Sequence, residues 1–294
     1  MVVRGLGEEL RRTLRRIREF AYARRPQPEG ARPTLGLALG GGFARGIAHI
    51  GVLKVLEENG LRPDCLAGTS AGSLIAGGYA SGASIEELTR VARRIRWRDF
   101  ARWTVSRMGL ASNARMESFI RRFFRALRFE DLKIPLAVVA TDLIQGKPVV
   151  FTSGELATAL RASCAYPGLF LPVAYNGSLL VDGGLVWAVP TKPVAELGAD
   201  MVVAVPLDAG AEPVNPKSMV DVLGRSLSIA SDAAKPVWRE HADLIVEPLV
   251  GHYRWDDFER GDELIRAGEA AMREALPHLQ KLLAAQPAAK VTSG

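Results

Sequence analysis

The chain has 294 residues, enough to bury the core of one large domain or two small ones. Hydrophobic residues make up 48% of it and charged residues 24%, which is typical of soluble globular proteins and argues against intrinsic disorder. The formal net charge of +6 is compatible with an anionic partner, either nucleic acid or a phospholipid surface, and does not choose between them.

Signals for secretion, membrane spanning and disulfides are absent. The N-terminus lacks the apolar core of a secretion signal, and glycines and an arginine interrupt the longest apolar stretch, residues 35–53. Cys65 and Cys164 lie among apolar or small residues, and no Cys/His spacing suits a metal. We therefore expect a soluble cytoplasmic protein without a disulfide, a metal or another cofactor. Nothing in the sequence indicates an oligomeric state.

Residues 6–25 are predicted to form a basic amphipathic helix, with aliphatic residues at helical spacing and arginines on the other faces. Two interpretations are open: an arm docked on the main body, or an interfacial helix in peripheral contact with anionic membrane. Acidic residues disfavour a mitochondrial presequence. A Pro-rich linker completes this segment, 1–33, and separates it from the body, 34–285, whose motif-bearing core spans 35–205. Residues 286–294 are predicted to be a frayed tail.

The body opens with a strand over 34–39, a glycine loop over 40–46 and a helix over 47–59. This arrangement directs backbone N–H groups at one point beside a positive helix end. A dinucleotide would want the third glycine one residue before Gly46, and a nucleoside triphosphate would want a Gly-Lys-Ser/Thr ending, which is absent. A developing oxyanion needs only the amides. A tight turn without a ligand is the remaining alternative.

A candidate nucleophile follows in Gly68-Thr69-Ser70-Ala71-Gly72, which fits the Gly-x-Ser-x-Gly pattern of a sharp strand-to-helix turn. A strand is predicted over 64–67 and a helix of small residues over 71–80. An exposed serine at such a turn strains its backbone, so Gly68 and Gly72 must lack side chains for strand and helix to close on each other. The pentapeptide alone also occurs by chance.

Residues 84–130 are predicted to be helical and basic, with one helix capped by Ser84 and running to 96, and another from 113 or 114 to 128. Between the two helices lies an apolar, aromatic segment, formed by Trp97, Phe100, Trp103, Val105, Met108 and Leu110. It has two interpretations. It is either a cover over the site that admits an acyl chain or an ordinary part of the core.

A candidate base follows the short strand predicted over 179–181. Asp182-Gly183-Gly184 places a carboxylate at a strand end, where it would face a cleft, although the same triplet is a common turn. The remaining elements are strands over 134–140, 148–151, 201–205 and 242–246, and helices over 155–163, 191–197 and 257–283. Alternating strands and helices predict a parallel α/β sheet covered on both faces.

Taken together, the glycine loop, the Ser70 motif and the Asp182 motif resemble the patatin-like phospholipase family. The likeness extends over roughly residues 35–283 and includes the segments 48–53, 162–172 and 197–200. The resemblance implies an α/β three-layer sandwich with a mainly parallel central sheet. It also implies a serine hydrolase that cleaves acyl esters of lipids through a Ser–Asp dyad, with no cofactor.

Carried over position by position, Ser70 matches the family nucleophile, Asp182 its base, and the amides of Gly41, Gly42 and Phe43 the oxyanion hole. The supporting motif residues are Gly40, Arg45, Gly46, Gly68, Gly72, Gly183 and Gly184. Two departures stand out. Phe43 replaces the Gly or Ala usual in relatives, and no asparagine precedes Pro190 in the stretch around Trp187 and Ala188.

The dyad makes a physical demand, because an ordinary aspartate with a pKa near 4 is a weak base. A dry, apolar pocket would raise that pKa, which suits a lipid substrate. Three alternatives remain: a Ser–Asp–His esterase using His241, His252 or His278, a non-catalytic lipid-binding or regulatory module, and a nucleic-acid binder. The last is not expected, since the arginines lie on helix faces without interleaved aromatics. His49 is expected to be a packed or hydrogen-bonded core histidine.

Overall fold

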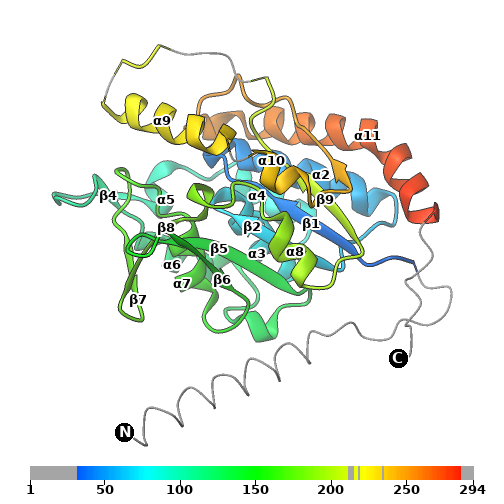
Figure 1. Ribbon diagram of the computed structural model, residues 1–294, viewed down its shortest axis with the longest axis horizontal. Helices are drawn as coiled ribbons and strands as arrows, with labels where there is room; N and C mark the ends of the chain where they lie inside the picture. Colours follow the sequence, from blue (N-terminus) through cyan, green and yellow to red (C-terminus); the bar gives the residue numbers. More distant parts are fainter. Residues whose placement is uncertain (1–31, 211–214, 218, 234, 286–294) are drawn as a thin grey trace, which may run out of the picture.

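The computed structural model describes residues 32–210, 215–217, 219–233 and 235–285 (Figure 1). The predicted N-terminal helix over 6–25, with its proposed membrane contact, and the tail over 286–294 lie outside the described residues. None of the described helices combines the length and the apolar character needed to cross a bilayer.

A central sheet organises the fold, with strand order β10-β9-β1-β2-β5-β8-β7 and β6 paired to β5. The strands from β10 to β5 are parallel to one another, whereas the pairs β5–β6, β5–β8 and β7–β8 are antiparallel. The bounds are β1 Leu35–Leu39, β2 Cys65–Thr69, β5 Leu136–Asp142, β6 Lys147–Phe151, β7 Val173–Tyr175, β8 Ser178–Asp182, β9 Met201–Val205 and β10 Leu244–Ile245.

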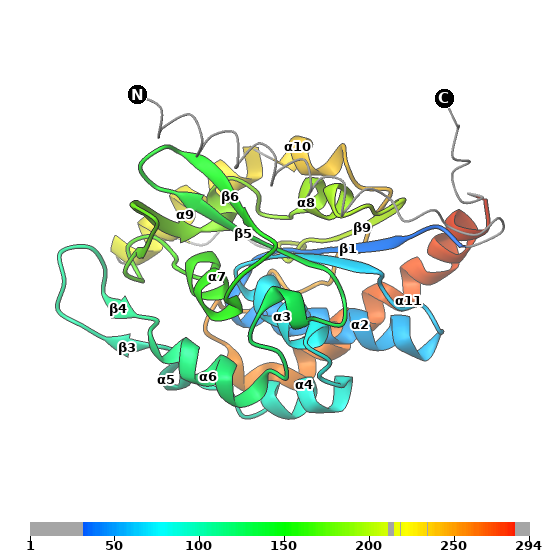
Figure 2. The same ribbon diagram turned by 90° about the horizontal axis from the view of Figure 1, so that it is seen from below.

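Helices cover both faces of the sheet, which confirms the predicted three-layer α/β fold (Figure 2). One face carries α2 (Ala48–Glu58), α3 (Ala71–Ala80), α7 (Leu156–Ser163) and α11 (Gly261–Ala285), with α4 (Ile85–Ala92), α5 (Trp97–Phe100) and α6 (Arg115–Phe123) beyond them. The other face carries α8 (Thr191–Glu196), α10 (Lys235–Arg239) and α9 (Met219–Ala233).

The alternation of side chains along the strands explains why a hydrophobic core lies on each face of the sheet. Along β1, Leu35, Leu37 and Leu39 enter the large core on the α2 side, while Ala38 enters the smaller core beneath α8 and α10. All five residues of β1 are buried, as expected for a strand covered on both faces. The carboxyl ends of β1 and β2 therefore meet at one edge of a fully covered sheet.

Several boundaries differ from the sequence prediction. The first basic helix has the predicted cap at Ser84, whose Oγ accepts from the Glu87 N–H at 3.2 Å and which forms a capping box with Glu87, but the helix ends at Ala92 rather than 96. Between α5 and α6 the chain forms a hairpin of β3 (Arg102–Trp103) and β4 (Ala111–Ser112). The helices α9 and α10 and the strand β7 were not predicted, and 3-10 turns occupy 43–47, 129–131, 183–185 and 258–260.

Two glycines let α2 and α11 cross in backbone contact. A Cβ at Gly51 would lie 2.6 Å from the amide nitrogen of Glu269, and one at Gly268 would overlap the carbonyl oxygen of Ala48. Because α2 directly follows the glycine loop, this crossing fixes the helix that supports the loop.

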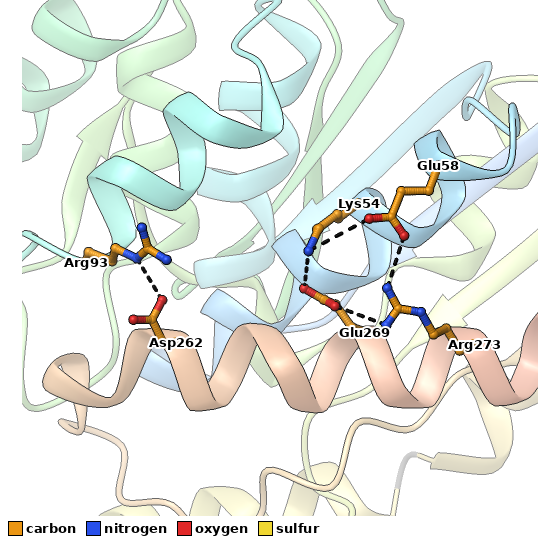
Figure 3. Close-up of polar contacts among 6 residues, drawn as sticks. All are labelled: Lys54, Glu58, Arg93, Asp262, Glu269 and Arg273. Atoms are coloured by element: carbon orange, nitrogen blue, oxygen red, sulfur yellow. Dashed lines mark hydrogen bonds and ion pairs between the residues drawn. The ribbon is translucent and has the colours of Figure 1, made fainter.

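Ion pairs line the same helix face (Figure 3). Lys54 of α2 reaches Glu269 at 2.7 Å, and Arg273 of α11 reaches Glu58 at 3.1 Å. Arg93, just after α4, pairs with Asp262 at 2.7 Å. Since most of these side chains are well exposed, we assign the stability of the crossing to its close packing rather than to its charges.

Gly268→Ala is expected to lower the free energy of unfolding by about 2–3 kcal/mol, because its methyl group must push two helices apart. Chemical denaturation measures the change. The matched control is Gly224→Ala in α9, where a Cβ would have only Tyr166 Oη at 3.9 Å; it should leave stability unchanged or raised by up to about 1 kcal/mol. Equal stability of both variants would contradict the role given to the crossing.

Candidate active site

The glycine loop and the serine turn are adjacent because the strands that lead into them, β1 and β2, are neighbours in the sheet. A Cβ at Gly41 would lie 3.2 Å from the Cβ of Ser70. Asp182 ends β8, which pairs with β5, and β5 pairs in turn with β2. The topology thus brings all three sequence motifs to one cavity of about 980 Å³ that is lined by Gly41, Gly42, Phe43, Ser70, Asp182 and Gly184.

The turn at Ser70 is strained and tightly packed. Its φ of 52° and ψ of −124° are unusual for a residue with a side chain. A Cβ at Gly68 would lie 2.6 Å from the Ser73 nitrogen, and one at Gly72 would lie 2.6 Å from the Gly40 oxygen, so neither position admits a larger residue. The Ser70 N–H donates to Ser163 Oγ at 2.8 Å, which holds the turn from α7.

Asp182 is buried, with 4% of its surface exposed. Its Oδ1 accepts from the Gly184 N–H at 2.8 Å. Oδ2 accepts no hydrogen bond of normal geometry from any described residue. The Ser70 hydroxyl nevertheless lies close enough to the carboxyl to lower its pKa. Burial raises the pKa of Asp182 to about 6, and the polar contacts of Ser70 and Gly184 offset this only in part.

Of the three amides expected to form an oxyanion hole, one is already engaged. The Gly41 N–H donates to the Ala188 carbonyl at 3.2 Å, which corrects the expectation that it faces the substrate. The amides of Gly42 and Phe43 donate to no backbone acceptor in the described part of the chain. These two are therefore the donors available to a negatively charged oxygen.

Both departures from the family pattern have a structural account. Phe43 has a φ of 53°, a conformation that glycine adopts without strain, and its ring packs edge-on against Tyr166 at 5.1 Å and Trp255 at 5.3 Å. Where an asparagine is missing, backbone carbonyls tie the loop down: that of Trp187 accepts from Thr69 Oγ1 at 2.9 Å, and that of Ala188 from Gly41.

The supporting motif residues hold the loop from behind. His49 Nε2 donates to the Gly40 carbonyl at 2.9 Å, and burial lowers the pKa of His49 to about 4, so the ring is neutral and hydrogen-bonded in the core. Arg45 Nε donates to the Tyr253 carbonyl at 2.8 Å. A Cβ at Gly46 would lie 2.5 Å from the Cβ of Ala71, so the loop closes directly on α3, and one at Gly183 would overlap the carbonyl oxygen of Val139.

The histidines considered for a triad are distributed unevenly. His252 lines the same cavity as Ser70 and Asp182, whereas His241 and His278 are exposed and lie outside it. No histidine in the described segments hydrogen-bonds to Ser70 or Asp182. This arrangement favours the dyad, with His252 as the one histidine that a triad could use.

A second cavity, of about 770 Å³, also reaches Ser70. It runs beside α3 and is bordered by α4 and α6, and Phe43 and Ser70 line both cavities. Its walls are mostly apolar, formed by Leu74, Ile75, Leu88, Val91, Ile95, Met116, Phe119, Phe123 and Phe124 among others. Ser70 therefore lies at the junction of the two cavities. A nucleophile that attacks an ester needs room on both sides of the ester bond, for the acyl part and for the alcohol part.

The sequence allows the apolar segment over 97–110 to be either a cover over the site or part of the core, and its two halves differ. Trp97 and Phe100 pack inside, with Trp97 stacked on Phe170 at 5.3 Å. Trp103, Val105 and Met108 are exposed on the β3–β4 hairpin. The segment is thus core at its start and surface at its centre.

Sequence reasoning missed the roles of Ser163 and Cys164. Ser163 Oγ fixes the Ser70 backbone, and the buried Cys164 thiol lies beside Ser70, where burial raises its pKa so that it stays protonated. In the sequence, only the family resemblance marks the segment over 162–172. No local pattern shows that Ser163 would contact the turn at Ser70. Within the described residues, no group of three or more His, Cys, Asp or Glu side chains is placed to hold a metal.

Comparison with known proteins identifies the class. The model of the patatin-like phospholipase family matches residues 37–195, more than half of the chain and the part that contains all three motifs. The chain belongs to the patatin-like phospholipase family.

Individual relatives carry the names of NTE family proteins or of lysophospholipases. An uncharacterised NTE family protein of Mycobacterium tuberculosis is 38% identical over 179 residues, which cover 60% of this chain and 49% of that protein. Lysophospholipase NTE1 of Mycosarcoma maydis is 35% identical over 197 residues, which cover 65% of this chain and 10% of that protein. The chain thus spans about half the length of the mycobacterial relative and far less of the fungal one.

Among solved structures, VipD from Legionella pneumophila is similar in fold. The TM-score is 0.58 at 14% sequence identity, and the match covers 85% of this chain and 68% of VipD. At this identity the likeness shows a shared arrangement of sheet and helices and carries nothing about substrate.

Asp182→Asn is expected to stabilise the protein at pH 8 and to have little effect near pH 4. The folded-state pKa of about 6 exceeds the ordinary value of 3.8, so the stability that this carboxyl provides when protonated is lost as pH rises through about 6. The loss amounts to about 3 kcal/mol, and a neutral amide avoids it. Thermal unfolding at both pH values measures the gain; exposed Asp131→Asn is the control. A destabilised Asn variant at pH 8 would contradict the assignment.

Proposed function

We propose that the protein is a serine acyl hydrolase that cleaves acyl esters of phospholipids or lysophospholipids through a dyad of Ser70 and Asp182. The observation that carries the proposal is that a strained serine and a buried carboxylate with a raised pKa line one cavity, beside two free backbone amides. Such perturbed pairs in a cleft are typical of catalytic sites.

In the proposed reaction, ionised Asp182 accepts the Ser70 proton as the serine oxygen attacks the ester carbonyl. The amides of Gly42 and Phe43 stabilise the negative charge on the carbonyl oxygen. Collapse of the tetrahedral intermediate breaks the ester bond, and Asp182 returns its proton to the leaving alcohol. Water, deprotonated by the same carboxylate, then attacks the acyl carbonyl; the acyl–Oγ bond breaks, the fatty acid leaves, and Asp182 returns the proton to the Ser70 oxygen. A base with a pKa of about 6 is better matched to neutral pH than an ordinary aspartate.

The two cavities divide the substrate between them in this proposal. The apolar cavity beside α3 takes the acyl chain, and the larger cavity takes the alcohol part. The first extends from Ser70 to Gly78, about 12 Å along the helix, and its walls combine aliphatic and phenylalanine side chains with charged ones such as Glu87, Arg94 and Arg122. The second is the larger of the two and also carries charged side chains, including Arg45, Asp208 and Lys235, which suits an alcohol part with a polar head group.

Replacing Ser70 with Ala, or Asp182 with Asn, is expected to lower kcat/KM on p-nitrophenyl butyrate by at least about 10³-fold. In the wild type, kcat/KM should rise with pH through about 6, because only the ionised carboxylate acts as a base. A fluorophosphonate should label the wild type and not the Ser70 variant.

His252→Ala and His278→Ala serve as the matched pair for this experiment. The dyad predicts nearly full activity for both. Loss of activity in His252→Ala, with retention in Asp182→Asn, would replace the dyad by a histidine base. A folded wild type that neither labels nor hydrolyses would favour a lipid-binding module instead.

Leu74→Trp is expected to shift the acyl preference toward short chains, because the indole would fill the cavity beside α3. The ratio of kcat/KM for p-nitrophenyl decanoate to that for the butyrate should fall about tenfold or more, since several methylenes lose their burial. Ile144→Trp on the exposed β5–β6 turn is the control. An unchanged ratio with full butyrate activity would move the acyl chain to the other cavity.

A further inference from the structure

The β3–β4 hairpin exposes large apolar side chains: Trp103 on β3, whose ring also contacts that of Trp97 at 5.8 Å, and Val105 and Met108 in the connecting loop. Trp103 is 63% exposed, Met108 is 53% exposed, and Val105 is fully exposed. The hairpin projects from the body at one end of the molecule in both views (Figures 1 and 2). Single exposed apolar residues are common on protein surfaces, but three within six positions of one projecting hairpin form a patch that water solvates poorly.

Positive charge flanks this apolar patch. Arg102 and Arg107 lie on the hairpin, and Arg98 and Arg115 lie at its base, where Arg115 donates to the Arg98 carbonyl at 3.0 Å. None of these four arginines has a carboxylate within ion-pair distance in the part of the chain that the structure describes. The sequence from 100 to 116 contains no acidic residue. The hairpin itself, 102–112, therefore combines exposed apolar side chains with two arginines and no acid, while the acids Asp99 and Glu117 lie just outside it.

The base of the hairpin is fixed to the body, and its inner side belongs to the candidate active site. The N–H groups of Leu110 and Ala111 both donate to the Leu169 carbonyl, at 3.1 and 2.8 Å, and Leu171 N–H donates back to Ala111. Residues 106–110 line the cavity that holds Ser70 and Asp182. Whatever the tip contacts is thus held at the entrance of that cavity.

We propose that the β3–β4 hairpin is a membrane-docking element that inserts Trp103 and Val105 into the interface of an anionic phospholipid bilayer. Tryptophan favours the boundary between head groups and hydrocarbon, while arginines at the same depth attract lipid phosphates. Docking at this position would place the mouth of the Ser70 cavity against the bilayer. The contact itself does not require catalysis; only the delivery of a lipid to Ser70 rests on the proposed function.

A bilayer fits this surface better than a second copy of the chain. In a two-fold dimer through the hairpin, the cationic flanks of both copies would be brought together, and like charges at close range oppose association. An anionic bilayer instead supplies negative charge around the tip and an apolar interior for its side chains. The charge pattern therefore selects the lipid surface as the occupant.

Vesicle co-sedimentation of the full chain tests the proposal, with Ser70→Ala as background so that no lipid is consumed. Partition onto phosphatidylglycerol/phosphatidylcholine vesicles should exceed that onto phosphatidylcholine alone. Trp103→Ser/Val105→Ser should weaken it about tenfold or more. Arg102→Gln/Arg107→Gln should weaken it about 30-fold at low salt and less at high salt. The matched control, Leu143→Ser/Ile144→Ser on the β5–β6 turn, should bind like the parent.

Circular dichroism checks that each variant is folded. Quenching of tryptophan fluorescence by brominated lipid is a second readout; it should diminish in Trp103→Phe while vesicle binding persists. In the Ser70 wild-type chain, Trp103→Ser/Val105→Ser should keep its rate on soluble p-nitrophenyl butyrate, so failure of docking and failure of catalysis are distinguishable. Unchanged vesicle binding in both hairpin variants would overturn the proposal. So would a dimer of the parent chain, detected by analytical ultracentrifugation, that the hairpin variants abolish.

Discussion

The candidate site depends on one steric constraint: the helix after Ser70 begins in direct contact with the backbone at the end of β1. Gly72 has no side chain, so it can approach the carbonyl groups of Leu39 and Gly40, and Gly68 likewise admits the backbone of Ser73. This contact holds the strained serine in place. It also sets the position of the glycine loop, which leaves the end of β1 at the same point.

At Asp182 the proposed function and the stability of the fold make opposite demands. A carboxylate that is buried with an unpartnered oxygen is destabilising at neutral pH, and a protein without a use for it would favour an apolar or amide residue. Sites that break the rules of stable folding in this way are typical of function. The surrounding core, covered on both faces of the sheet, is large enough to tolerate the loss.

The sequence predicts those features best in which the local backbone conformation or its burial permits only certain residue types. The turn at Ser70, the cap at Ser84 and the fully buried strands such as β1 all required particular residue types at particular places. The engagement of the Gly41 amide was not predictable, because its acceptor, Ala188, is distant in the chain. The helix α9 was missed because Val222 and Ile229 are exposed rather than buried, so no core-facing stripe marks it.

The glycine crossing of α2 and α11 has a consequence for how the chain matures on the ribosome. The residues of α2 emerge early, but their glycine-bearing face meets its partner only after synthesis has passed Gly268. Until then a nascent chain carries an uncovered apolar helix of the kind that chaperones bind. The pocket around Ser70 can therefore become rigid only after α11 has been synthesised, however early the serine itself has emerged.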